Sequence, residues 1–254
     1  MKQTGNTILI TGGGSGIGAS LAQRFHDLGN TVVAAGRRRE ALEGAIAGRP
    51  NMHAIELDVE SAGGVDDFAR RLLAEHPAVN VLVNNAGIMR FEALDRSRDL
   101  ADAEATINTN LLGPIRLIDA LVGHLVAQPN AAIVNVTSGL AFVPLVVTPT
   151  YNATKAAIHS YTLALRDALQ GRVEVIELAP PAVQTGLTPG QESRPGYQPL
   201  DAFTDEVMAL FAQQPTPREI LVERVRFLRF AEAENRFDAT MAQLNEFAAK
   251  AREG

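Results

Sequence analysis

A glycine-rich segment near the N-terminus constrains the possible folds of this chain more than any other feature. Residues 7–10 form a short apolar, β-branched run that predicts a buried strand, and residues 17–28 have the pattern of an amphipathic helix. Between them the chain reads Thr-Gly-Gly-Gly-Ser-Gly-Ile-Gly. Glycines at such a place let the backbone turn tightly and approach a pyrophosphate at the positive end of the helix. We therefore predict the start of a dinucleotide-binding fold; the alternative is a tight turn without a ligand.

The rest of the chain alternates strands with helices, which predicts a parallel sheet with helices on both faces. We expect strands at residues 7–10, 31–35, 52–57, 80–83, 132–137 and 173–178. The longest helices are expected at residues 99–126 and 150–170. The predicted fold class is α/β, a three-layer, doubly wound parallel sheet. With 46% hydrophobic residues and no linker or low-complexity tract, the 254 residues are expected to form a single domain.

Tyr151 and Lys155 lie four residues apart in the second long helix, so they share one face. A free tyrosine titrates near ~10. A neighbouring ammonium favours the phenolate, so we expect Lys155 to lower the pKa of Tyr151 and to make the pair suitable for acid–base catalysis. The alternative is an ordinary tyrosine and lysine on a surface helix.

With these two features and several further motifs, the chain resembles the short-chain dehydrogenase/reductase family from about residue 4 to about residue 188. The glycine loop of the family corresponds to Thr11, Gly12, Gly16 and Gly18, and its Asn-Asn-Ala-Gly motif to Asn84, Asn85, Ala86 and Gly87. Its catalytic serine and its helix asparagine correspond to Ser138 and Asn110. Segments 140–144 and 179–183 look like those of a subgroup often labelled DltE-like, a label of sequence kinship and not of substrate. The resemblance implies one NAD(P)-binding Rossmann domain over residues 1–254.

The resemblance also implies a role for each site residue. Tyr151 would donate a proton to the carbonyl oxygen, Ser138 would hydrogen-bond the same oxygen, and Lys155 would bind the nicotinamide ribose. Asn110 would hold a water molecule in a proton relay. The cofactor would contact Gly12, Ser15, Gly16, Ile17, Gly18, Arg37, Arg38, Asp58, Val59, Asn85, Ala86, Gly87, Tyr151, Lys155, Pro180, Val183 and Thr185. Pro181 stands where the family usually has glycine, which leaves the geometry of that turn open.

The cofactor assignments carry some alternatives. Asp58 is placed near the adenine, but it could be a solvated turn carboxylate. Residues 84–87 could chiefly hold the central strand to the glycine loop. After the second strand, Arg37 and Arg38 follow a glycine, and no acidic residue is present there to bind a ribose 2′-hydroxyl. An arginine at this place accepts a 2′-phosphate, which favours NADP, with NAD as the alternative.

Composition and charge argue against several other classes of function. The net charge of -6 speaks against general affinity for nucleic acid or anionic membranes. The chain has no cysteine for a disulfide or a thiolate site, and its histidines lack metal-binding spacing, so we expect no metal. No apolar run near the ~20 residues of a membrane helix and no secretory leader is evident, which predicts a cytoplasmic protein.

The C-terminal region gives weaker signals. Residues 186–199 have the composition of a loop and residues 201–211 that of an amphipathic helix, and by resemblance residues 186–215 are a substrate lid. Leu187, Tyr197 and Leu200 would close it over a moderately hydrophobic compound. Residues 216–219 fit the capping box of a helix, whereas residues 220–230 alternate like a final strand, and both remain open. A homo-oligomer, dimer or tetramer, is expected.

The expected function is reversible hydride transfer between a nicotinamide cofactor and the carbonyl or alcohol carbon of a small molecule. Two alternatives remain. One is epimerisation or dehydration of a sugar nucleotide, which normally needs a larger C-terminal domain. The other is a non-catalytic dinucleotide sensor or scaffold. The complete tetrad argues against a sensor, because a sensor does not need a positioned acid.

Overall fold

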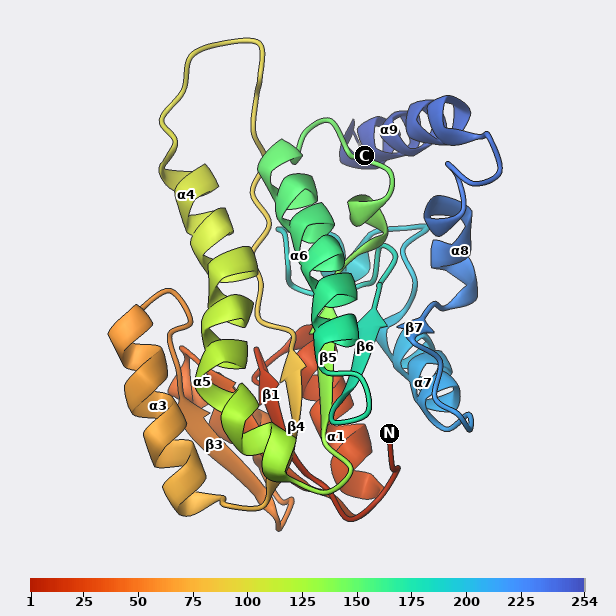
Figure 1. The fold of residues 1–254 in the computed structure, drawn as a ribbon. Coiled ribbons are helices and arrows are strands. Elements are labelled where there is room, and N and C mark those ends of the chain that lie inside the picture. The colour runs from red at the N-terminus through yellow and green to blue at the C-terminus, as the bar shows by residue number, and fades with distance from the viewer. Residues whose placement is uncertain (254) are drawn as a thin grey trace.

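The computed structural model describes the backbone of residues 1–253 and the side chains of residues 1–250. Within this part of the chain, parallel strands form one seven-stranded sheet in the order β3-β2-β1-β4-β5-β6-β7 (Figure 1). The strands are β1 (Thr7–Thr11), β2 (Thr31–Gly36), β3 (Met52–Glu56), β4 (Val79–Asn84), β5 (Ala132–Val136), β6 (Glu174–Leu178) and β7 (Glu219–Ile220). The strand order reverses between β1 and β4, so the loops after these two strands open a crevice at the carboxyl edge. The predicted fold class is confirmed.

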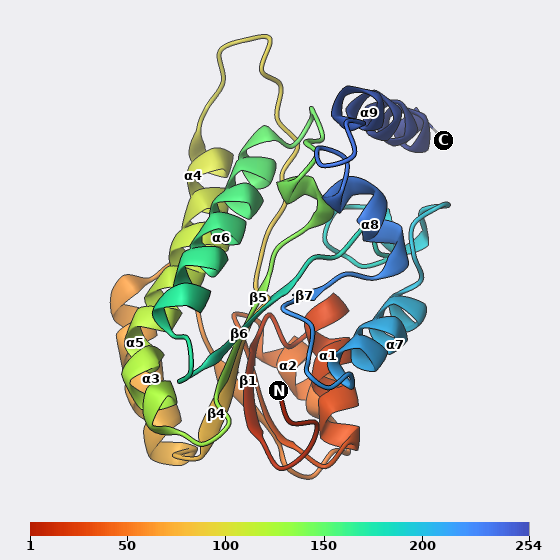
Figure 2. The ribbon, with the colours of Figure 1, turned by 45° about the vertical axis from the view of Figure 1, so that its right-hand side comes forward.

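Helices cover both faces of the sheet and complete three layers (Figure 2). One face carries α1 (Gly16–Asp27), α2 (Arg39–Ile46) and α7 (Leu200–Phe211), and the other carries α3 (Ala62–Glu75), α4 (Ala101–Ile107), α5 (Gly113–Ala127) and α6 (Pro149–Ala168). The alternation of strand side chains explains the two cores. Ile8 and Ile10 of β1 belong to the core with Phe25 of α1, whereas Leu9 belongs to the core with Leu117 of α5.

All six predicted strands are present, with boundaries shifted by a residue or two. The helix expected at residues 150–170 is α6. The helix expected at residues 99–126 is three segments: α4, one π-helical turn at Asn108–Leu112, and α5. Asn110 lies in this π turn and contacts Ile88 in the loop after β4.

The C-terminal region combines both structures that the sequence left open. The capping-box interpretation is wrong, because Thr216 accepts a hydrogen bond from the N-terminal ammonium (2.7 Å) and Glu219 lies in strand β7. The strand interpretation holds for two residues only, since α8 (Glu223–Arg229) follows directly. A further helix, α9 (Phe237–Glu253), lies above the carboxyl ends of the strands (Figure 1).

The continuous helical run of residues 101–127 corrects one expectation. It is long and apolar enough to span a membrane by length and composition, with a mean hydropathy of 1.3 over its most apolar window. Only 39% of that window is buried. Leu117, Leu121 and Leu125 pack in the core against the sheet, which explains why one side of this helical run is apolar. The other side leaves apolar side chains at the surface.

Candidate active site

The glycine loop after β1 is held tightly against the loop after β4. Gly12 adopts a left-handed conformation with φ of 66°, and a Cβ on it would lie 2.8 Å from Asn85 Nδ2. The Asn85 amide donates to the Thr11 carbonyl (2.9 Å), and the Thr11 hydroxyl accepts from the backbone N–H groups of Asn85 and Ala86 (3.0 Å each). The Asn-Asn-Ala-Gly motif thus has a structural task in addition to lining the crevice.

Two adjoining cavities follow the carboxyl edge of the sheet from the loop after β2 to α6. They share Gly12, Ser15, Arg37, Arg38, Ala86, Gly87 and Ile88. Most predicted cofactor residues line them: Gly12, Ser15, Gly16, Ile17, Arg37, Arg38, Val59, Asn85, Ala86, Gly87, Tyr151, Lys155, Pro180, Val183 and Thr185. We call this pair of cavities the nucleotide cleft. Its open backbone cradle and its paired arginines fit a phosphorylated dinucleotide.

Two predicted cofactor residues lie outside the nucleotide cleft. Gly18 is packed beneath the loop, because a Cβ there would collide with the Gly12 carbonyl oxygen. Asp58 is exposed, and its carboxylate accepts the backbone N–H of Glu60 (3.1 Å), as the turn-carboxylate alternative predicts. Pro181 lines the cleft together with Pro180 and Val183.

Glu60 is a cleft residue that the sequence reasoning missed. Its carboxylate pairs with Arg37 (3.2 Å) and accepts the hydroxyl of Thr109 (2.7 Å). Arg38 points instead toward the glycine loop, with a long contact to the Ser15 hydroxyl (3.4 Å). The one sequence signal for this pairing is that Glu60 follows the third strand as Arg37 follows the second. The separation of the two residues along the chain does not by itself predict their contact.

Tyr151, Ser138 and Lys155 meet at the other end of the nucleotide cleft. Lys155 donates to the carbonyl oxygen of Val136 (2.9 Å), and its Nζ lies 5.5 Å from the centre of the Tyr151 ring. Burial raises the pKa of Tyr151 to about 12, although its hydrogen bond with Ser138 opposes the change. Burial also lowers the pKa of Lys155 to about 8. The expected lowering of the tyrosine pKa is therefore wrong for this structure, because burial disfavours the charged phenolate.

Asn110 clamps the chain after β4. Its side-chain oxygen accepts the Ile88 N–H (2.8 Å), and its amide donates to the Ile88 carbonyl (2.8 Å). This two-point contact fixes the backbone that borders the nucleotide cleft. The structure thereby brings all four predicted tetrad residues to one end of the sheet.

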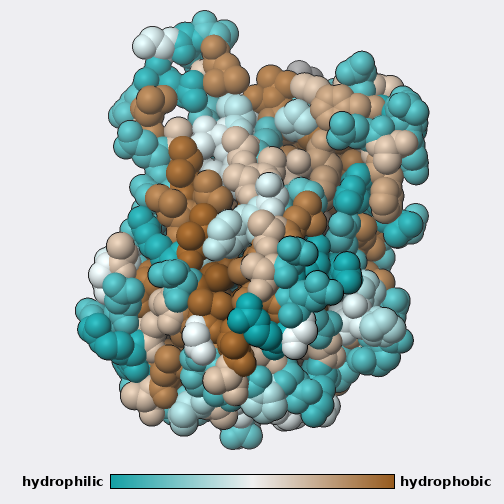
Figure 3. All heavy atoms as spheres, viewed as in Figure 1, coloured by the Kyte–Doolittle hydropathy of each residue, from teal (hydrophilic) through white to brown (hydrophobic). Residues whose placement is uncertain are grey.

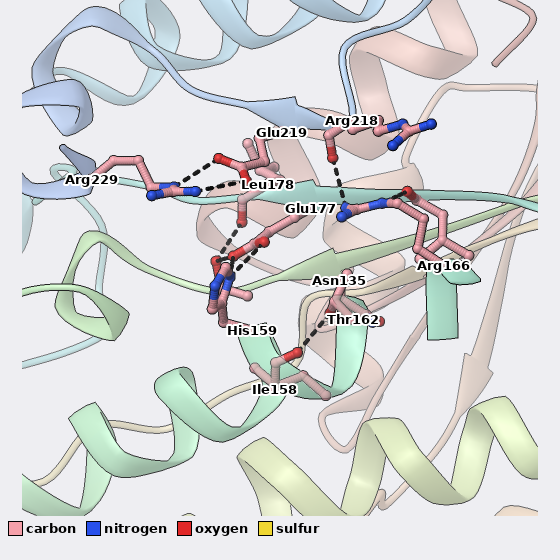
Figure 4. Close-up of polar contacts among 12 residues, drawn as sticks. Asn135, Ile158, His159, Thr162, Arg166, Glu177, Leu178, Arg218, Glu219 and Arg229 are labelled. Atoms are coloured by element: carbon pink, nitrogen blue, oxygen red, sulfur yellow. Dashed lines mark hydrogen bonds and ion pairs between the residues drawn. The ribbon is translucent and has the colours of Figure 1, made fainter. Parts of the chain in front are cut away.

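A buried polar network fixes α6 to the sheet beneath these residues (Figure 4). Glu177 of β6 is fully buried, and its carboxylate accepts the Thr137 hydroxyl (2.7 Å) and pairs with His159 Nδ1 (2.8 Å). His159 follows Tyr151 and Lys155 on α6 at the same four-residue spacing, hence on the same face. The network holds the helix that carries the tyrosine, which agrees with a structural role for this histidine.

Comparison with known proteins identifies the family. The family model for short chain dehydrogenases matches residues 6–195. The chain belongs to the short-chain dehydrogenase family. Its relatives include the uncharacterized oxidoreductase DltE of Bacillus subtilis, 41% identical over 249 residues that cover 96% of this chain and 98% of that protein. The NADP-dependent 3-hydroxy acid dehydrogenase YdfG of Shigella flexneri is 30% identical over 73% of each chain.

Solved structures show the same architecture. A short chain dehydrogenase from Burkholderia cenocepacia in complex with NADP superposes with a TM-score of 0.82 at 26% identity, over 96% of this chain and 99% of that one. The likeness extends well beyond the region matched by the family model, so the short-chain dehydrogenase fold includes the C-terminal part of this chain.

On the far side of Tyr151, this dehydrogenase has a further cavity, which we call the substrate-side cavity. It is lined by Met89, Ser138, Gly139, Leu140, Leu145, Tyr151, Pro180, Pro181, Ala182, Leu187, Gln191, Tyr197, Leu228, Leu244, Phe247 and Ala248. Leu187 and Tyr197 belong to the expected lid, and Leu244 and Phe247 belong to α9. Sequence reasoning missed this contribution of α9 because Leu244 and Phe247 lie more than ninety positions from Tyr151.

Proposed function

We propose that the protein reduces a carbonyl compound with NADPH and catalyses the reverse oxidation of the alcohol with NADP. The observation that carries this proposal is the unbroken cleft from Arg37 and Arg38, past the glycine loop, to Tyr151 beside Ser138. The NADP-dependent relative and the NADP-bound relative support this cofactor, and NAD is the alternative.

The protein's own residues bind, orient and move the proton. Bound NADPH would supply a hydride to the carbonyl carbon. The Tyr151 phenol would donate its proton to the carbonyl oxygen, so that hydride and proton together give the alcohol, and Ser138 would hold that oxygen by a hydrogen bond. Lys155 would donate to the ribose hydroxyls. The amide of Asn110 is bonded at both ends to Ile88, so positioning this loop is its first task, with the proposed water relay in addition.

The pKa values indicate which of the two side chains carries a proton near neutral pH. A phenol with a pKa of about 12 is fully protonated near neutral pH and is ready to donate. A lysine with a pKa of about 8 still carries its charge at pH 7. General acid catalysis of this kind contributes about 10²- to 10⁴-fold.

Loss of NADPH absorbance during incubation with ketones and aldehydes tests the proposed function. Turnover that depends on Tyr151 supports a dehydrogenase. The alternative, a dinucleotide sensor or scaffold, predicts tight NADPH binding without turnover of any carbonyl compound in the panel. That pattern, in protein that binds NADPH with a defined stoichiometry, would refute the enzyme assignment.

We also propose that a second copy of this chain covers the outer face of α4, α5 and α6. Figure 3 shows apolar side chains gathered on this side of the molecule, and Ile107 of α4 and Leu163 of α6 are exposed. Leu163→Glu should shift the protein to a monomer in sedimentation velocity. Leu28→Glu, at an exposed leucine after α1, is the matched control and should not. A wild-type monomer at micromolar concentration would refute the proposal.

A further inference from the structure

The wall of the substrate-side cavity carries no charged side chain among residues 1–250. Its aliphatic and aromatic members come from the loop after β4, the loop after β5, the lid, α8 and α9. A substrate that reaches Tyr151 therefore places the rest of its body against apolar groups. Because of this composition, an apolar carbonyl compound can enter the cavity at a low desolvation cost, whereas a charged one cannot.

Of the four polar side chains in this wall, Gln191 and Tyr197 contact neighbouring protein groups. The Gln191 amide donates to the Val183 carbonyl (2.8 Å) and the Thr185 hydroxyl (3.2 Å), and its oxygen accepts from Thr188 (2.8 Å). The Tyr197 hydroxyl accepts a long contact from Arg194 (3.4 Å). Ser138, Tyr151 and the O–H of Tyr197 are then the polar groups left for a substrate, and in the proposed function the first two are committed to its carbonyl oxygen.

Helix α9 forms a fixed roof over the cavity. On one side, the Asn245 side chain accepts the Val146 N–H (2.8 Å) and donates to the Pro144 carbonyl (3.2 Å), which ties α9 to the loop after β5. On the other side, the Phe247 ring stacks on Tyr197 of the lid at 6.4 Å and 29°. These contacts hold Leu244 and Phe247 above the site where the carbonyl group would bind.

Gly196 allows the roof and the lid to meet. It adopts a left-handed conformation with φ of 82°, and a Cβ on it would lie 2.8 Å from the Phe247 ring. The aromatic ring therefore packs directly on the lid backbone. Roof and lid form one apolar surface that faces the substrate.

From these observations we propose that α9 makes the enzyme selective for uncharged, apolar ketones and aldehydes and against carbonyl compounds that carry a carboxylate directly on the reacting carbonyl or within two methylene groups of it. This inference rests on the proposed function. A carboxylate in this cavity would lose its hydration without gaining a cation, and a single tyrosine hydroxyl does not replace the lost hydration. An apolar group of the same size would gain from leaving water.

Matched pairs of substrates test the inference, because each pair differs mainly in one methyl group or one charged oxygen. Butane-2,3-dione is compared with pyruvate, hexane-2,5-dione with 4-oxopentanoate, and 1-phenylpropane-1,2-dione with phenylglyoxylate. With NADPH saturating, kcat/KM should favour the neutral member of each pair by about a hundredfold, well above the twofold statistical advantage of a diketone. A preference below about fivefold overturns the inference.

Variants of α9 separate the role of the roof from the intrinsic reactivity of the substrates. Leu244→Arg adds a cation to the roof and should reduce the preference by about tenfold or more, through better use of the keto acids. Phe247→Arg, at a more exposed position, is a second variant if the first does not fold. Gln243→Arg adds the same charge at an exposed position outside the cavity and should change nothing.

The outcomes distinguish this inference from the proposed function. An unchanged preference in both roof variants, or an equal change in Gln243→Arg, overturns the role of α9 while NADPH-dependent turnover stands. Absence of turnover with every pair and with both cofactors overturns the proposed function, and this inference with it. A reduced preference in the roof variants alone supports both.

Discussion

Replacing Arg38 by alanine should weaken NADPH binding more than replacing Arg37 by alanine, although Arg37 comes first after the second strand. Both side chains line the nucleotide cleft. Arg37 already pairs with the Glu60 carboxylate, whereas the Arg38 side chain makes only its long contact to Ser15 within residues 1–250. A 2′-phosphate would therefore compete with a carboxylate for Arg37 but not for Arg38.

The expected magnitudes follow from the kind of contact. A charge-assisted hydrogen bond to a phosphate contributes about 1.5–3 kcal/mol, so Arg38→Ala should weaken NADPH binding about 10- to 150-fold. The Arg37–Glu60 pair is solvent-exposed, with 56% and 30% of the two side chains accessible. Such a pair is worth about 0.2–1 kcal/mol. Arg37→Ala should therefore reduce NADPH affinity by a factor that is up to about fivefold smaller than the factor for Arg38→Ala. Glu60→Gln should strengthen NADPH binding by up to about fivefold, because it removes the carboxylate that competes for Arg37.

Fluorescence titration with NADPH and NADH measures these effects. NADH affinity should stay within about twofold in all variants, because NADH lacks the phosphate. Arg39→Ala is the matched control, since Arg39 pairs with Glu43 (2.8 Å) and lies outside the cleft. A larger loss for Arg37→Ala than for Arg38→Ala, or equal losses for NADPH and NADH, would refute the reasoning. Wild-type preference for NADH would refute the choice of NADP itself.

Three further predictions concern catalysis, stability and motion. Tyr151→Phe should keep NADPH affinity and lower turnover by about 10²-fold or more, and retention of a tenth of wild-type turnover would falsify the assignment. Because burial lowers the pKa of Lys155 from 10.5 to about 8, the folded state binds fewer protons than the unfolded state between these values. Lys155→Met should thus raise the free energy of unfolding at pH 7, as measured by urea denaturation. The difference from the wild type should shrink as pH rises from 8 to 10.5, and a difference that stays constant over this range would contradict the reasoning. Hydrogen exchange across residues 186–199 should slow from apo protein to ternary complex, and equal exchange in all states would rule out a lid.

Much of the fold and site could be predicted from the sequence, because the signals are local. The glycine loop between a strand and a helix, and the spacing of Tyr151 and Lys155, each depend on a few neighbouring residues. The resemblance to the family added Ser138 and Asn110. In a parallel sheet the carboxyl ends of the strands share one edge, so residues placed after those ends had to meet.

Other properties depend on contacts between distant segments, and only the tertiary structure decided them. The direction of the Tyr151 pKa shift follows from burial by several elements, which no local spacing encodes. Glu60 reaches Arg37 because β2 and β3 are neighbours, and α9 covers the cavity because Asn245 and Phe247 dock on loops far away in the chain. The sequence by itself identified the groups that are proposed to carry the chemistry. The tertiary structure decided how strongly burial shifts the pKa values of these groups and which side chains line the cavity beside them. Both depend on how completely the packed chain excludes water.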